Sequence, residues 1–169
     1  STFTSTATPP YSYHPLYLSL TGSQTIGGVT SADEDVLRFD GHNWSLLFDG
    51  SDVGLVSTDL FAFSVLDADT ILMSFSTNVT VNGISVTPQD IVRFDATSLG
   101  STTAGTFSLY FDGSDVGFDT GSENIDSLSL LPEGRLLIST IGNPSVPGLN
   151  TGRDEDVLAF TPASLGAAT

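Results

Sequence analysis

The seven residues FDGSDVG occur twice in the chain, at residues 48–54 and again at residues 111–117. An identity of this length is too long to arise by chance in 169 residues. Three further segments align around a polar start and an apolar run: DEDVLRF at 33–39, QDIVRF at 89–94 and DEDVLAF at 154–160. Internal repetition constrains the fold strongly, because each copy forms one supersecondary unit that must pack against its neighbours.

Each unit is predicted to contain four short strands. Residues 71–75 and 136–140 are apolar or β-branched runs, and residues 36–39 alternate between two faces. Residues 44–48 and 107–111 are a third strand, and residues 60–66 and 125–131 a fourth that runs into an acidic or glycine turn. Because no long stretch has an apolar stripe at the helical period of about 3.6 residues, the fold is predicted to be all-β.

These strands divide the chain into an N-terminal arm, residues 1–16, and an all-β repeat domain, residues 17–169. The units are expected at about 17–70, 71–135 and 136–169, so the chain holds about two and a half of them. Four antiparallel strands per unit favour the β-propeller type, which closes with about four to eight blades. Either the chain is part of a longer one, or several copies complete a ring, or the sheets form a β-sandwich or barrel instead.

The pieces FDGSDVG, LPEGRLLIST, SVPGL and DEDVLAFTPASLG resemble a repeat found in propeller-like modules of large exported bacterial proteins. The resemblance covers residues from about 17 to 166, and QDIVRF departs from it by lacking the leading acidic pair. It implies a fold and a location outside the cytoplasm. It implies no catalytic role.

Charge and composition exclude several classes of function. Twenty acidic residues against four arginines, with no lysine, give a net charge of −16, which repels nucleic acid and anionic membranes. The chain has no cysteine, and no apolar run approaches the about 18 residues of a membrane span. Together with the many hydroxyl and glycine residues, this composition is typical of an exported protein at the cell surface or outside the cell.

The repeated acidic turns have two interpretations. As structure, Asp-Gly after an alternating strand predicts a hairpin turn, and the second aspartate would accept hydrogen bonds from backbone amides. As a site, carboxylates and carbonyls in such turns would hold calcium, the one cofactor that the sequence indicates. The candidate calcium ligands are the paired aspartates of the repeats: Asp33, Asp35, Asp49, Asp52, Asp112, Asp115, Asp154 and Asp156.

Two arginines recur at the same place in the repeat, Arg38 and Arg93, whereas the third copy has Ala159. An arginine that recurs in a chain with only four is expected to have a fixed carboxylate partner. The predicted partner is the aspartate of FDG on the following strand, or the aspartate that opens the arginine's own strand. Both arginines are therefore predicted to form structural salt bridges.

Carbohydrate binding would use aromatic side chains, and Trp44 and Tyr110 are the candidates. Because Phe107 occupies the place of Trp44 in the next copy, this position is also typical of a core residue. Asn43 and Asn78 begin N-x-Ser/Thr sequons and are candidate glycosylation sites.

The sequence therefore predicts a non-catalytic extracellular module with a structural or adhesive role, which mediates protein assembly or surface interaction. Its expected partners are other proteins or copies of itself, as a homo-oligomer or part of a larger assembly, and glycans are a further class. The first alternative is a calcium-dependent carbohydrate-binding module. The second is a secreted hydrolase, although no catalytic motif singles out any of the carboxylates.

Overall fold

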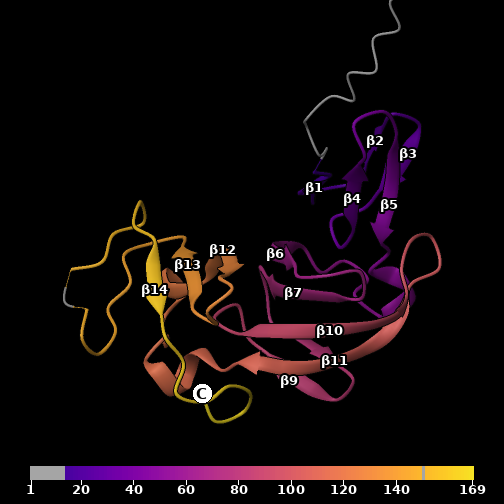
Figure 1. Cartoon of the computed structure of the whole chain (residues 1–169). Coiled ribbons are helices and arrows are strands. Elements are labelled where there is room, and N and C mark those ends of the chain that lie inside the picture. The colour runs from indigo at the N-terminus through magenta and orange to yellow at the C-terminus, as the bar shows by residue number, and fades with distance from the viewer. Residues whose placement is uncertain (1–13, 150) are drawn as a thin grey trace, which may run out of the picture.

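The computed structural model describes residues 14–149 and 151–169, and this part of the chain is all-β (Figure 1). The strands are β1 (Leu16–Leu18), β2 (Gln24–Ile26), β3 (Val29–Ser31), β4 (Val36–Phe39), β5 (Trp44–Phe48), β6 (Leu60–Val65), β7 (Thr70–Phe75), β8 (Val79–Val81), β9 (Ile84–Val86), β10 (Ile91–Ser98), β11 (Ala104–Phe111), β12 (Ile125–Leu130), β13 (Leu136–Thr140) and β14 (Leu158–Phe160). The helices are short 3-10 turns, η1 (Ser51–Val53), η2 (Gly113–Val116) and η3 (Gly121–Glu123). Within these ranges no helix has the length or apolar character that crossing a membrane requires.

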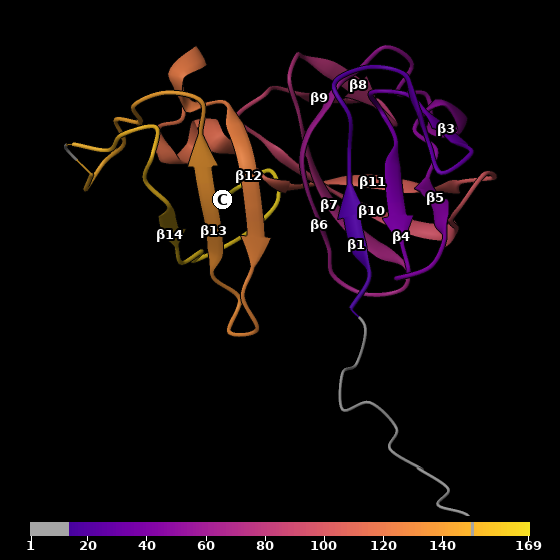
Figure 2. The ribbon, with the colours of Figure 1, turned by 90° about the horizontal axis from the view of Figure 1, so that it is seen from above.

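The main strands form three antiparallel sheets, which follow one another along the chain. The second sheet is a four-stranded meander in the order β6-β7-β10-β11, and the β8–β9 hairpin lies between β7 and β10 in sequence. The first sheet, β1-β4-β5, has the same connectivity with the β2–β3 hairpin at the corresponding place. The third sheet is β12-β13-β14. In Figure 2 the third sheet stands beside the other two, with β12 on the side nearest to β6.

The sheet boundaries differ from the predicted unit boundaries. We expected residues 60–66 and 125–131 to end a unit, but β6 pairs with β7 and β12 pairs with β13. The acidic turn after β6 is therefore a hairpin within one sheet, closed by a hydrogen bond from Leu66 N to Thr70 O of 3.0 Å. Successive antiparallel strands have the same pattern on both sides of a turn, so the sequence does not show which turn separates two sheets.

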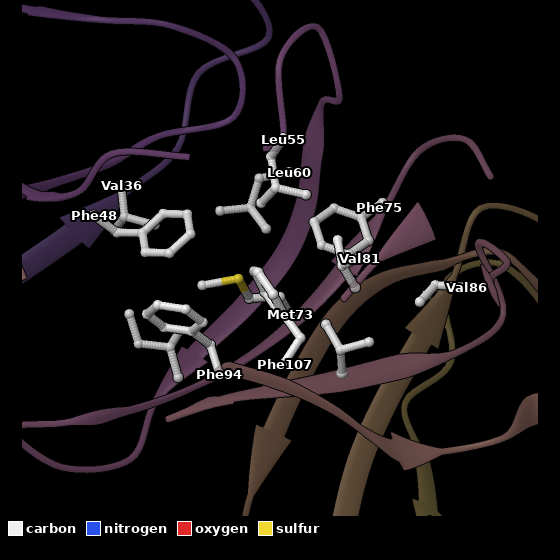
Figure 3. Close-up of a cluster of buried hydrophobic side chains, with 12 residues drawn as sticks. Val36, Phe48, Leu55, Leu60, Met73, Phe75, Val81, Val86, Phe94 and Phe107 are labelled. Atoms are coloured by element: carbon white, nitrogen blue, oxygen red, sulfur yellow. The ribbon is translucent and has the colours of Figure 1, made fainter. Parts of the chain in front are cut away.

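The two interfaces between the sheets bury matching side chains. Between the first and second sheets, the rings of Phe48 and Phe94 meet edge to face with centroids 5.2 Å apart, within the cluster that Figure 3 shows. Between the second and third sheets, Phe111 and Phe160 meet in the same way at 5.3 Å. Phe48 aligns with Phe111 in the sequence repeat, and Phe94 with Phe160. The two sheet interfaces are therefore packed with equivalent side chains.

The expected N-terminal arm falls mostly outside the described residues, because residues 1–13 are not among them. Its last residue, Leu16, begins β1 and pairs with Phe39 of β4.

Candidate functional site

The FDGSDVG segments lie where one sheet meets the next, and each forms a 3-10 turn. In the first copy, the Asp49 carboxylate accepts hydrogen bonds from the backbone N–H (3.2 Å) and hydroxyl (2.7 Å) of Ser51. In the second copy, Asp112 accepts the same two bonds from Ser114, at 3.1 and 2.7 Å. The first aspartate of each segment therefore accepts the N–H of the serine two residues on, at the start of a 3-10 turn, and Asp112 is also the N-cap residue of η2.

The glycine after each of these aspartates has a different role from the one predicted. The structure contradicts the hairpin interpretation, because Gly50 has an ordinary φ of −68° and leads into η1. A Cβ added at Gly50 would lie 2.5 Å from the Glu34 carbonyl oxygen, and one at Gly113 would lie 2.4 Å from that of Gln89. Glycine is required here because the backbone of the preceding acidic loop comes too close for any side chain.

The first junction, between the first and second sheets, is closed by three backbone-to-side-chain hydrogen bonds. Gly50 N–H donates to Asp35 Oδ1 at 3.0 Å, which fixes the turn to the loop before β4. Asp49 N–H donates to the hydroxyl of Thr103 at 2.9 Å, and Thr103 N–H donates to Asp52 Oδ2 at 2.8 Å. Thr103 belongs to the loop between β10 and β11, so the second sheet reaches back to the turn of the first.

The second junction, between the second and third sheets, repeats these contacts with the corresponding residues. Gly113 N–H donates to Asp90 Oδ1 at 3.0 Å. Asp112 N–H donates to the hydroxyl of Thr169 at 2.9 Å, and Thr169 N–H donates to Asp115 Oδ2 at 3.0 Å. The matching segments are SLGSTT at residues 98–103 and SLGAAT at residues 164–169.

The first strand of each following sheet is held at the same junction. Leu60 N–H donates to the carbonyl of Asp33, and the Leu60 carbonyl accepts from the hydroxyl of Ser19 at 3.2 Å. At the second junction, Ile125 N–H donates to the carbonyl of Pro88, and the Ile125 carbonyl accepts from Ser74 at 2.8 Å. In the third sheet the corresponding serine, Ser139, bonds to the Asp126 carboxylate of its own sheet.

Most of the candidate calcium ligands serve as hydrogen-bond acceptors for backbone amides in this arrangement. Asp35 and Asp90 use both carboxylate oxygens to accept backbone amides, and Asp49, Asp52, Asp112 and Asp115 also accept N–H groups. Asp156 accepts from Arg153 N–H at 3.0 Å, and Asp154 N–H donates to Asn143. Among the described residues, no three carboxylate or histidine side chains lie together in a group that could hold a metal ion.

An acidic group of three residues, Asp33, Glu34 and Asp59, lies at the first junction. Burial raises the pKa of Glu34, and a hydrogen bond with the Asp33 carboxyl raises it further. Burial also raises the pKa of Asp59, with repulsion from Asp33 as the second cause. At the second junction the corresponding residues are neutral: Gln89 donates to the side chain of Asn124 at 2.8 Å.

Glu123 is a buried structural residue beside the second junction that was not among the residues predicted from the sequence. Its side chain accepts four hydrogen bonds, from the N–H groups of Asp119, Thr120 and Ser145 and from the Thr120 hydroxyl. Burial alone would raise the pKa of Glu123, but these bonds lower it overall. The signal in the sequence was T-x-x-E, the pattern of a capping box, which the structure forms at η3.

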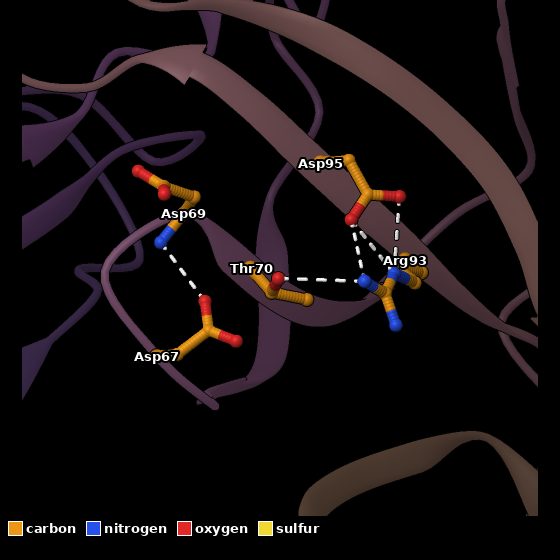
Figure 4. A network of polar contacts seen from close by, with 5 residues as sticks. All are labelled: Asp67, Asp69, Thr70, Arg93 and Asp95. Atoms are coloured by element: carbon orange, nitrogen blue, oxygen red, sulfur yellow. Dashed lines mark hydrogen bonds and ion pairs between the residues drawn. The ribbon is translucent and has the colours of Figure 1, made fainter.

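Of the two recurring arginines, Arg93 forms a salt bridge, although with a carboxylate other than the two predicted partners, and Arg38 forms none with a described residue. Arg93 pairs with Asp95 at 2.7 Å, two residues along its own strand, rather than with Asp90 or Asp112 (Figure 4). This pair raises the pKa of the Arg93 guanidinium. Arg38 is exposed and forms no ion pair with a described residue.

The predicted salt bridge of Arg38 is therefore wrong, and the reason is local. The residue at the place of Asp95 is Asp40, whose carboxylate accepts the N–H groups of His42 and Asn43 at 2.8 and 2.7 Å. These bonds hold Asp40 in the β4–β5 turn.

The two candidate sugar-binding aromatics lie in different sheets and are both packed. Trp44 stacks on Phe39 with ring centroids 4.9 Å apart, and its ring lies against Gly27 of the β2–β3 hairpin. Its counterpart Phe107 is buried against Phe94. Tyr110 lies on β11, and burial raises the pKa of its hydroxyl. Of the two sequon asparagines, Asn43 lies in the β4–β5 turn and Asn78 precedes β8, and both are exposed.

Comparison with protein-family models, with curated proteins and with solved structures found no match to this chain.

Proposed function

We propose that this chain is a non-catalytic structural module of an exported protein, and that its units are of the four-stranded β-propeller type, of which the second sheet has all four strands. In this proposal further units assemble on this chain through junctions of the kind described above, as copies of the chain or within a larger extracellular or cell-surface assembly. The single observation that carries the proposal is the junction itself, because the same donor and acceptor atoms close it twice.

The chemistry of the acidic residues supports a structural role. A general acid or base needs a carboxyl group that is free to exchange a proton with a substrate. The repeated aspartates instead accept hydrogen bonds from backbone amides, in the same geometry in both junctions. The strongly negative surface and the absence of cysteine and lysine support export.

The test is the mass of the protein in solution, by light scattering over a range of concentrations in calcium-containing buffer. We expect a multiple of 17.6 kDa. Val157 lies directly before β14 with 66% of its surface exposed, so Val157→Asp should reduce the mass to that of one chain without unfolding it.

The matched control is Val56→Asp. Val56 is 67% exposed but lies between η1 and β6, away from β14, and its substitution should leave the mass unchanged. A single-chain mass at every concentration, or an equal effect of both substitutions, contradicts self-assembly through this edge.

A further inference from the structure

The outer edge of the third sheet has no partner strand among the described residues. β14 has three residues and lies at the end of the order β12-β13-β14. Figure 2 shows it as the outermost strand, on the side of the sheet away from β6. In the second sheet the corresponding strand, β10, has eight residues and pairs on its outer side with β11.

An apolar groove of about 600 Å³ runs along β14. Its lining includes Phe111, Phe118, Ile138, Val146, Leu158 and Phe160. Val157, which also lines the groove, is 66% exposed, although Val36 and Ile91 at the same place in the other two sheets are fully buried. An edge strand beside an apolar groove is a template for binding another strand.

The second sheet shows what fills the corresponding space. There, β11 places Phe107 opposite Phe94 and Leu109 opposite Val92. The ring of Phe107 lies 4.8 Å from that of Phe94, and Leu109 packs against the same cluster. In the third sheet, Phe160 and Leu158 are at the places of Phe94 and Val92, because they face the matching residues of the neighbouring strand.

The polar half of the same junction is also present. In the first two sheets, Oδ1 of Asp35 or Asp90 accepts the N–H of the glycine in the FDG turn, Gly50 or Gly113. The other oxygen, Oδ2, accepts a backbone N–H three residues earlier in the same loop. Asp156 makes the second of these bonds, to Arg153 N–H through Oδ2, and is exposed.

We propose that the groove beside β14 binds an extended segment of the type that forms β5 and β11 in this chain, aromatic-Ser-Leu-x-Phe-Asp-Gly. Residues 44–50 and 107–113 are the two examples in this chain. The aromatic residue packs against Phe160, the leucine against Leu158, and the glycine N–H donates to Asp156 Oδ1, while backbone bonds to β14 fix the register. This inference rests on the proposed function, because it names the segment that the assembly edge receives.

The test uses a fluorescently labelled peptide with the sequence of residues 104–117, AGTFSLYFDGSDVG, and the full chain. Fluorescence anisotropy should show saturable binding. Hydrogen exchange should show that the amides of β14 become protected when the peptide is added. A scrambled peptide should not bind, and N-methylglycine in place of the glycine after FD, which removes the donor to Asp156, should weaken binding about tenfold.

Two protein variants make the test specific. Asp156→Ala should weaken binding about tenfold, since it removes the acceptor for the glycine N–H. Asp154→Ala removes a neighbouring carboxylate whose counterparts, Asp33 and Pro88, accept the N–H of the following sheet's first strand through the backbone carbonyl, so binding should not change.

The proposal is overturned if the peptide does not bind, if protection appears on strands other than β14, or if Asp156→Ala binds as tightly as the unmodified chain. Its failure differs from failure of the proposed function. An assembly that persists without peptide binding would reject this groove as the site, whereas a monomer that binds the peptide would reject self-assembly and retain the groove.

Discussion

Replacement of Asp90 by alanine is the most direct test of the junction. The Asp90 side chain is 6% exposed and accepts the N–H groups of Gly113 and Thr87 and the Thr87 hydroxyl. A hydrogen bond to a charged acceptor contributes about 1.5–3 kcal/mol, and a buried amide left without a partner costs about 1–3 kcal/mol. Because Gly113 N–H is buried, we expect Asp90→Ala to lower the free energy of unfolding by about 3 kcal/mol.

The assay is urea denaturation followed by circular dichroism, with a thermal melt as a second measurement. For a chain of this size, a loss of about 3 kcal/mol lowers Tm by about 6 to 12 °C. Asp156→Ala is the matched control, since its exposed side chain accepts one N–H, from Arg153, and should cost about 1 kcal/mol or less. The reasoning is refuted if Asp90→Ala is no more destabilising than Asp156→Ala.

Three further outcomes are expected. Gly113→Ala should destabilise the protein by about 1–3 kcal/mol, because its Cβ would meet the Gln89 carbonyl, whereas Gly121→Ala, with open space around it, should change stability by less than about 0.5 kcal/mol; urea denaturation measures both. Glu34→Gln, which copies Gln89, should stabilise the chain at neutral pH. Burial raises the pKa of Glu34 in the folded state, so folding penalises the charged form of this carboxyl. The stability gained by Glu34→Gln should therefore disappear as the pH falls through the raised pKa to the ordinary carboxyl range. Thermal melts from pH 3 to 8 measure this, and a gain that does not depend on pH would contradict the reasoning. Calcium and magnesium at equal concentrations should raise Tm equally, by screening the net charge of −16, and a rise specific to calcium would show a site that the capping role of the aspartates does not explain.

Much of the local structure follows from the sequence. The alternation at residues 36–39 and the aromatic-aliphatic run at 44–48 predict β4 and β5 with their observed bounds. The prediction that the fold is all-β is confirmed. Side-chain periodicity determines these features locally, so no long-range information was needed.

The grouping of strands into sheets could not be predicted in the same way. Residues 60–65 fit equally well as the last strand of one sheet or the first of the next, and pairing with β7 decides between them. The Asp-Gly pair at 49–50 was also open to more than one structural interpretation. Glycine permits a hairpin turn, but here it permits close contact with the Glu34 backbone, which only the fold reveals.

The sequence identified many of the residues of the candidate site, but not the residues that they contact. The repeated aspartates are at the junctions, but their partners, Thr103 and Thr169, lie more than fifty residues further along the chain than the turns they bind. The matching segments SLGSTT and SLGAAT were a signal that such partners exist. Arg93 pairs with the nearby Asp95 because residues two apart on a strand lie on the same face of the sheet.

The loop that ends in Thr103 has a consequence for how such a chain can change in evolution. The second sheet takes part in both junctions. Its loop with Thr103 binds the FDGSDVG turn of the first sheet, and its own FDGSDVG turn binds the later segment that ends in Thr169. Recombination between two copies at equivalent positions therefore regenerates an intact junction at the crossover. Whole units can be duplicated or deleted in this way, and no surface in the array has to acquire a new complementary partner.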